Sequence, residues 1–179
     1  MNRHTPSVFY GVFNAEAISR LIRATVEFGS ESDRFAAVSF EKRRSFSADF
    51  AHSPENTWLY ERVWELFVAF NQTYALEITD IQAPIQIIRY PNGGRIDWHL
   101  DGGREQTKNE RKLSLSIQLS SPDDYRGGDL EFAGQSVEPL SRTIGSAICF
   151  PSYCVHRVTP ITEGERFSLV CFAVGPRFR

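Results

Sequence analysis

The stretch YPNGGRIDWHLD, residues 90–101, sets how the rest of the sequence is interpreted. The asparagine and two glycines predict a turn that leads into a short strand carrying His99 and Asp101. Side chains two residues apart on a strand point to the same face, so this imidazole and this carboxylate would enter one space. A metal there needs a third ligand, and His156 is the best candidate. Two histidines and one carboxylate, with the other coordination positions open, suit non-haem Fe(II).

The composition predicts one globular domain. The chain has 179 residues, of which 41% are hydrophobic and 23% are charged, and these are ordinary values for such a domain. The net charge of −2 gives no general attraction to nucleic acids or anionic lipids. The sequence has no apolar run of the ~18 residues that a membrane helix needs, and its first residues lack the apolar segment of a signal peptide. We therefore expect a cytoplasmic protein with no nucleic-acid or membrane partner.

The three cysteines do not resemble a zinc site. Cys149, Cys154 and Cys171 are odd in number and show no CxxC spacing, whereas thiolate ligands of zinc usually come in close pairs. Cys149 and Cys171 lie in apolar runs and are expected to be buried free thiols. Free thiols fit a reducing compartment.

Two helices are expected before residue 80. The first spans 15–28, with Asn14 as its N-cap. The second would begin at Ser53 and Pro54, which suit the N-cap and first helical positions, and would run to about Leu76.

Short strands are expected after residue 80, where Gly, Pro, Asp and Ser separate apolar stretches. An edge strand is also expected at 43–50, with Arg43 and Arg44 on a solvated face, and a lead-in strand within 1–13. The stretch 102–112 is too polar to pack and predicts a mobile flap. The candidate strands after residue 80 are 84–90, 95–100, 112–119, 129–133, 136–138, 146–150, 155–158 and 166–174.

This order of elements predicts an α+β fold that is mainly β. About eight short strands indicate an antiparallel sandwich or jelly roll, and the N-terminal helices would pack on one sheet. We expect a single domain over residues 1–179, in which 1–80 provide helical support and 81–179 form the jelly-roll catalytic core.

Arg166 is a cation inside an apolar strand, in GERFSLVCF. A buried arginine is costly unless it meets an anion, and its guanidinium matches the two oxygens of a carboxylate. Ser168, two residues further on, shares its face and can donate another hydrogen bond. The anion would be a cosubstrate carboxylate or an internal one such as Glu131.

Four stretches resemble one enzyme family. They are RYPNGGRIDWHLD, KLSLSIQLS, PDDYRGGDLEF and FPSYCVHRVTPITEGERFSL, and they span about residues 86–172. The HxD pair, the distal histidine and the arginine ten residues beyond it are similar to those of the Fe(II)/2-oxoglutarate-dependent dioxygenases. Among these enzymes, the chain most resembles the prolyl 4-hydroxylase-like branch.

The resemblance implies a double-stranded β-helix in which His99, Asp101 and His156 bind Fe(II). It implies that Arg166, with Ser168, binds the far carboxylate of 2-oxoglutarate, and that O2 is the co-oxidant, with ascorbate as an optional reductant. It also implies pocket roles for Tyr90, Leu130 and Gln118, the last of which stands where many relatives carry an aromatic residue. Asp97 is expected to contact substrate or Arg95.

The substrate stays open at this point. The resemblance favours hydroxylation of a prolyl residue in a protein or peptide, with a free amino acid or other small molecule as the alternative. A non-catalytic jelly-roll binding module is a further alternative. The complete set of metal ligands, His99, Asp101 and His156, together with Arg166, argues against it, because a binding module would not need them. Nucleic-acid dealkylation is disfavoured because position 172 is Phe172, where such enzymes carry a second arginine, and a zinc hydrolase is disfavoured because no HExxH motif is present.

Overall fold

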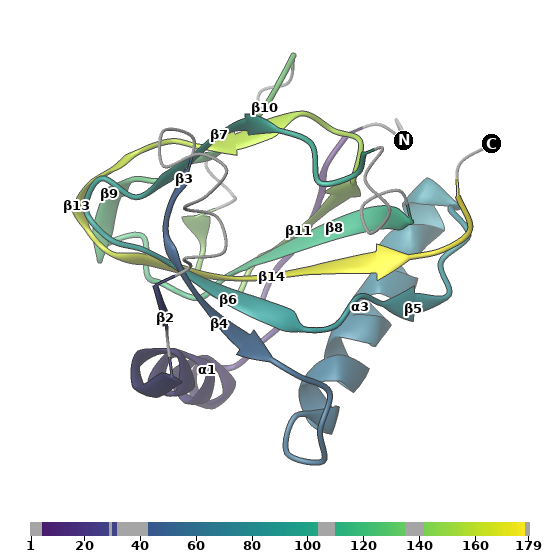
Figure 1. The fold of residues 1–179 in the computed structure, drawn as a ribbon, viewed down its shortest axis with the longest axis horizontal. Coiled ribbons are helices and arrows are strands. Elements are labelled where there is room, and N and C mark those ends of the chain that lie inside the picture. The colour runs from purple at the N-terminus through teal and green to yellow at the C-terminus, as the bar shows by residue number, and fades with distance from the viewer. Residues whose placement is uncertain (1–4, 29, 32–42, 104–109, 135–141, 178–179) are drawn as a thin grey trace.

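Antiparallel strands make up most of the molecule, and two helices cover one side of them (Figure 1). The computed structural model describes residues 5–28, 30–31, 43–103, 110–134 and 142–177. The helices are α1 (Ala15–Phe28) and α3 (Thr57–Tyr74). The strands are β1 (Ser7–Phe9), β2 (Ser30–Glu31), β3 (Arg43–Arg44), β4 (Phe46–Phe50), β5 (Asp80–Ile81), β6 (Ile85–Tyr90), β7 (Arg95–His99), β8 (Arg111–Gln118), β9 (Tyr125–Gly127), β10 (Leu130–Phe132), β11 (Ala147–Pro151), β12 (His156–Val158), β13 (Ile161–Gly164) and β14 (Arg166–Val174).

The large sheet has the strand order β1-β11-β8-β14-β6-β4-β2, and β5 pairs with β14. Its central strand β14 lies antiparallel to both neighbours, so that Ser168 is opposite Gln118 on β8 and Ile88 on β6. Strands far apart in the sequence therefore lie side by side, as a jelly roll requires. The predicted mainly β, α+β fold is confirmed.

The strand β8 shows how the sequence builds this sheet. Leucine and serine alternate in it, and successive side chains on a strand point to opposite faces. Leu113, Leu115 and Ile117 pack in the core that faces the helices. Ser114 and Ser116 line a cavity on the other face. Strand β8 thus contributes apolar side chains to the face of the sheet that packs on the helices and serine side chains to the face that lines the cavity.

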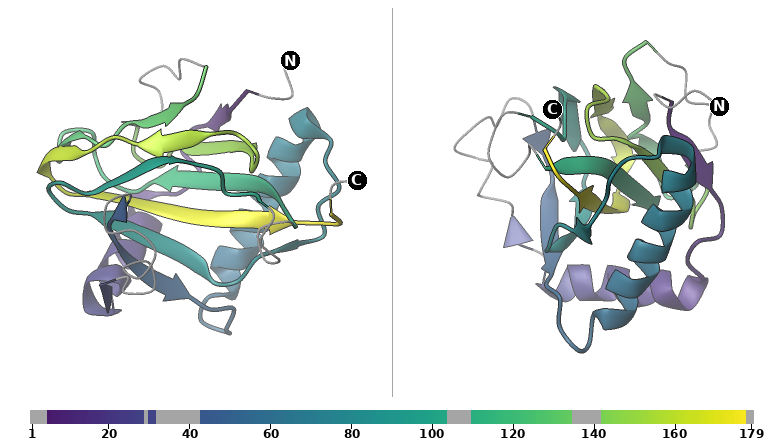
Figure 2. Two further views of the ribbon diagram at one scale, coloured as in Figure 1. Left: turned by 45° about the horizontal axis from the view of Figure 1, so that its top comes forward. Right: turned by 90° about the vertical axis from the view of Figure 1, so that its right-hand side faces the viewer.

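Both helices pack on the large sheet, on the side away from the small sheet (Figure 2). The buried stripe of α3 repeats at three- and four-residue spacing, as an amphipathic helix requires, and consists of Leu59, Tyr60, Val63, Leu66, Phe67, Phe70 and Tyr74. The Tyr74 hydroxyl donates a hydrogen bond to the Cys149 carbonyl oxygen at 2.6 Å, which ties the end of α3 to β11. At the start of α1, the Asn14 side chain accepts from the Ala17 amide at 2.9 Å, and this confirms the predicted N-cap.

The small sheet has the order β10-β12-β7-β3 and faces the polar side of the large sheet, and β13 pairs separately with β9. A second apolar cluster fills part of the space between the sheets, with Ile88 and Tyr90 from the large sheet against Leu130 and Val158 from the small one. The remaining space is the cavity described below.

The second helix begins later than predicted. The structure places its start at Thr57, with Asn56 as the N-cap residue, instead of at Ser53 and Pro54. The Ser53 hydroxyl donates to the Glu55 carboxylate at 2.9 Å and so does not cap a backbone amide. The Ser53 carbonyl oxygen accepts from the Asn56 amide in a turn that precedes the helix.

Most predicted strands are present within one or two residues of their expected bounds. The structure adds four short strands that were not predicted, namely β2, β5, β9 and β13. The predicted strand at 136–138 lies outside the described residues. Residues 104–109 of the predicted flap at 102–112 also lie outside them, and the last two flap residues, Arg111 and Lys112, belong to β8. Strands β1, β3 and β4 precede residue 80 and yet extend both sheets, so the expected helical support also contributes strands. In the part of the chain that the structure describes, neither helix is long and apolar enough to cross a membrane.

Candidate metal centre

A β-bulge in β7 aims His99 into the interior. His156 pairs with His99 and Val158 pairs with Ile96, so two steps along β12 correspond to three along β7. The extra residue at Asp97 and Trp98 changes the side-chain alternation. As a result, Ile96 packs in the inner core while His99, three residues on, also lines the cavity. Bulges near functional sites commonly redirect a side chain in this way.

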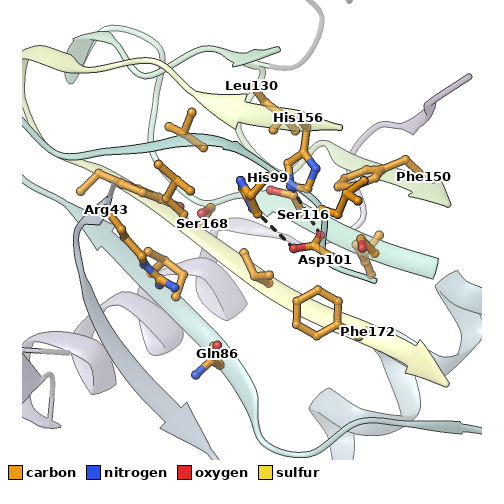
Figure 3. A pocket seen from close by; sticks show the side chains of 18 of the residues that line it. Arg43, Gln86, His99, Asp101, Ser116, Leu130, Phe150, His156, Ser168 and Phe172 are labelled. Carbon is orange, nitrogen blue, oxygen red and sulfur yellow. Dashed lines mark ion pairs between the residues drawn. The ribbon is translucent and has the colours of Figure 1, made fainter. Parts of the chain in front are cut away.

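Three side chains converge at this point. The Nε2 atom of His99 lies 3.5 Å from one oxygen of Asp101, and the Nε2 atom of His156 lies 3.4 Å from the other. Figure 3 shows both imidazoles directed at the Asp101 carboxylate. All three ligand atoms lie within 4.8 Å of one another, and among the described residues no other group of His, Cys, Asp or Glu is arranged to hold a metal. The structure therefore brings together the three residues that the sequence nominated.

Backbone carbonyl groups fix the orientation of both imidazoles. The Nδ1 atom of His99 lies 2.8 Å from the Asp97 carbonyl oxygen, and that of His156 lies 3.0 Å from the Cys154 carbonyl oxygen. A carbonyl oxygen only accepts, so each Nδ1 carries the proton and each Nε2 lone pair is available to a metal. This arrangement is typical of metal-binding histidines.

The electrostatics put two of the three groups in the state that a metal requires. Burial alone raises the pKa of Asp101, but the neighbouring side chains of His99 and His156 lower that pKa to about 2. Burial also lowers the pKa of His156, and the nearby Asp101 only partly opposes this effect. At neutral pH Asp101 is a carboxylate and His156 a neutral imidazole, which are the ligand forms that bind divalent metals.

Arg166 is buried on the opposite wall and is only partly satisfied. It is 4% exposed, and its Nε atom donates to the Gln118 side-chain oxygen at 3.0 Å. Its Nη1 atom is buried and has no hydrogen-bond partner among the described residues. Glu131, the internal carboxylate considered as its partner, instead pairs with Arg157 at 2.7 Å. A buried guanidinium with an unused donor is the feature expected where an anionic ligand binds.

The metal-site residues and Arg166 line one cavity of about 320 Å³ between the two sheets. Tyr90, Leu130 and Ser168 line it as well, as the sequence predicted for these three pocket residues. Tyr90 is buried, and the Arg166 guanidinium lies 5.4 Å from its ring centroid. Gln118 does not line the cavity, because its side chain lies behind Arg166, where its amide nitrogen donates to the Tyr125 hydroxyl at 2.9 Å.

Three further charged residues line the cavity: Arg43, Asp97 and Arg111. The sequence did not predict this position for Arg43 or Arg111, and for Asp97 it suggested only a contact with substrate or Arg95. Arg43 lines the cavity, so the expectation that it belongs to a solvated face was wrong. It reaches the site because β3 pairs with β7 beside Ile96. Arg111 also lines the cavity and lies 3.6 Å from the centre of the Phe172 ring. Asp97 lines the wall too, and its carboxylate is 3.6 Å from Arg95, the partner that the sequence suggested.

Ser114 and Ser152 are part of the site and were missed. Ser114 lines the cavity together with Asp101, and its hydroxyl oxygen lies 3.0 Å from that of Ser152. Both serines are buried. The alternation in β8 indicates that Ser114 faces the interior, but no local pattern connects it with Asp101 or with the turn that carries Ser152.

Known proteins are similar to this chain in sequence and in fold. The family model of the 2OG-Fe(II) oxygenase superfamily matches residues 85–174, which is half of the chain. A PKHD-type hydroxylase of Pseudomonas aeruginosa is 26% identical over 181 residues, covering 92% of this chain and 74% of the relative. A Pseudomonas putida prolyl-4-hydroxylase has a similar structure, with a TM-score of 0.75, 21% identity and coverage of 97% of this chain and 94% of that one.

A prolyl hydroxylase from Trichoplax adhaerens, solved with a peptide fragment of the hypoxia inducible factor oxygen degradation domain, is also similar. Its TM-score is 0.75 at 15% identity, and the match covers 94% of this chain and 83% of that one. At this low identity, both solved structures support the jelly-roll fold. The superfamily match, which spans all three metal-site residues and Arg166, shows that this chain belongs to the 2OG-Fe(II) oxygenase superfamily and is a dioxygenase that uses Fe(II), 2-oxoglutarate and O2.

Proposed function

We propose that this oxygenase hydroxylates a prolyl residue in a peptide or protein, with His99, Asp101 and His156 as the Fe(II) ligands. The observation that carries the site assignment is the buried Nη1 atom of Arg166, which has no hydrogen-bond partner among the described residues. It lines the same cavity as the three metal-site residues. A dicarboxylate bound to the metal at one end would give this guanidinium its missing acceptor.

Each pocket residue has a role in this proposal. Arg166 binds the far carboxylate of 2-oxoglutarate, and Ser168, buried on the same strand, donates a further hydrogen bond. Gln118 holds the Nε side of Arg166 and so directs the other guanidinium nitrogens toward the cavity. Tyr90 and Leu130 form walls that keep water away from the cosubstrate.

The bound Fe(II), together with 2-oxoglutarate and O2, supplies the oxidising power that places a hydroxyl group on an unactivated carbon. The protein contributes position and exclusion of water. Asp101 would supply one metal ligand, and its carboxylate oxygens lie 3.5 and 3.4 Å from the Nε2 atoms of His99 and His156, the other two candidate ligands. Phe150 packs edge-on against His156, at 4.7 Å between ring centroids, and shields that ligand from solvent.

The choice of a prolyl substrate is supported by the relatives, several of which are prolyl hydroxylases, one solved with a bound peptide. The cavity is small for an enzyme pocket and must also hold the cosubstrate, so only one side chain of a larger substrate would enter it. A free amino acid or another small molecule also fits this limit and is the second candidate. The expected cytoplasmic location and the absence of nucleic-acid and membrane partners remain predictions.

The test is an anaerobic titration with Fe(II) and 2-oxoglutarate, followed by addition of O2 and a library of proline-containing peptides. The expected result is succinate release that a peptide stimulates, and a peptide product that gains the mass of one oxygen atom at proline. Stimulation by a free amino acid but by no peptide would support the second candidate. Failure of the protein to bind Fe(II) and 2-oxoglutarate would contradict the site assignment.

A further inference from the structure

Apolar side chains surround the mouth of the cavity. Eight large hydrophobic residues are exposed in the described part of the chain, and four of them lie within three residues of a metal-site histidine in the sequence. Isolated exposed hydrophobic residues are ordinary on protein surfaces, whereas a cluster beside an active site indicates a binding surface. The four are Trp98, Leu100, Tyr153 and Val155.

Strand pairing brings three of these residues together. His99 pairs with His156 in antiparallel register, so the next positions, Leu100 and Val155, are neighbours. Trp98 is 46% exposed and Leu100 is 45% exposed, and both line the cavity. Trp98 occupies the β7 bulge, lines the cavity and also contacts Arg157 on the neighbouring strand β12.

The indole of Trp98 is held in place from outside. The Arg157 guanidinium lies 4.7 Å from its ring centroid, and Arg157 is itself paired with Glu131 at 2.7 Å. A fixed aromatic surface loses little conformational entropy when it binds a ligand, and aromatic surfaces of this kind bind proline-containing peptides in extended conformation.

We propose that Trp98, Leu100 and Val155 bind the peptide segment that flanks the hydroxylated residue, with an apolar or prolyl residue of that segment on the indole. This inference rests on the proposed function, because it requires a peptide substrate. A free amino acid would fill the cavity and would leave this surface uncovered.

The test separates peptide binding from catalysis. Protein loaded with Mn(II) and 2-oxoglutarate, which does not turn over, is titrated calorimetrically with a ten-residue oligoproline and with free L-proline. The expected result is that oligoproline binds the wild type and binds Trp98→Ala about tenfold more weakly, a typical effect for an aromatic contact residue. The matched control is Tyr10→Ala, since Tyr10 is an exposed aromatic residue outside the cavity lining.

Equal affinity of the wild type and Trp98→Ala for oligoproline, or no binding of oligoproline to the wild type, would overturn the proposal. Trp98→Phe, which keeps an aromatic face, should retain most of the affinity. Mn(II) and 2-oxoglutarate binding is measured first in every variant. If the wild type binds neither Mn(II) nor 2-oxoglutarate, the proposed function is wrong. If it binds both but does not bind oligoproline, only the proposed peptide-binding surface is wrong.

Discussion

His99 and His156 pair directly across β7 and β12, and their ring centroids are 4.2 Å apart. Two imidazoles this close direct their Nε2 atoms into one space, and the Asp101 carboxylate closes it. The two strands are distant in sequence but adjacent in the small sheet, so the site depends on correct sheet formation.

Removal of any one of the three ligands should abolish metal binding. His99→Ala, Asp101→Ala and His156→Ala should each weaken Mn(II) binding by about 100-fold or more, because losing a ligand costs more than losing a residue that supports one. Succinate formation should fall to background. His52→Ala is the matched control, since His52 stacks on Tyr60 away from the cavity. An Asp101→Ala enzyme with the native turnover rate would show that the ligand assignment is wrong.

Arg166→Gln should affect the cosubstrate and leave the metal in place. Truncating one partner of a buried charge pair costs about 2–5 kcal/mol, so 2-oxoglutarate affinity should fall by about 30-fold or more. Mn(II) affinity should stay near the wild-type value, because Arg166 contacts none of the three ligands. Calorimetric titrations with Mn(II) and then with 2-oxoglutarate separate the two effects. Loss of both affinities together would indicate a folding defect instead.

Gly128→Ala should destabilise the fold more than Gly134→Ala does. Both glycines have positive φ, of +69° and +73°, so each substitution carries a backbone cost of about 1 kcal/mol. An added Cβ at Gly128 would meet Ile161 Cδ1 and would lie 3.2 Å from Arg166 Cδ, whereas one at Gly134 would meet nothing within 4 Å. We expect crowding to add about 1–3 kcal/mol at Gly128 only.

Urea denaturation of the two variants checks this expectation, and the difference between them isolates the crowding. Gly128→Ala should also weaken 2-oxoglutarate binding, because the added Cβ would move the Arg166 side chain by a few tenths of an ångström. Equal free energies of unfolding for the two variants would show that the Gly128 site adapts without cost.

At pH 8, Cys154 should react with a thiol reagent in the folded protein, whereas Cys149 and Cys171 should not. Burial raises the pKa of Cys149 and of Cys171, and it raises the pKa of Cys154 to about 11. A raised pKa keeps a thiol protonated and unreactive. Titration with a thiol reagent should therefore label only the half-buried Cys154 slowly in the folded protein, and all three cysteines in guanidinium chloride. Cys154→Ser should remove the slow phase, and rapid labelling of two or more thiols in the native state would contradict the prediction.

The sequence predicted the strands and the metal site where the pattern was local and strong. The alternation in β8 and the apolar run of β14 were sufficient to place both strands within a residue. His99 and Asp101 share a motif, and His156 follows a clear strand. The short strands β9 and β13 were missed because they are only three and four residues long and depend on pairing with each other.

Other features depend on contacts between distant segments and leave no local signal. The side chain of Ser53 bonds to Glu55, so a sequence with good capping residues does not begin its helix there. Gln118 was expected in the pocket, and yet it supports Arg166 from behind. Arg43 reaches the cavity only through the pairing of β3 with β7, which no periodicity reveals.

The bulge at Asp97 and Trp98 makes chain length, as well as residue identity, a requirement in this part of the protein. If the same residues paired with β12 in regular alternation, without the bulge, His99 would lie on the opposite face from Ile96 and its imidazole would turn toward solvent, although every ligand would still be encoded. Homologues and engineered variants that keep the present number of residues between Ile96 and His99 must therefore keep the bulge as well.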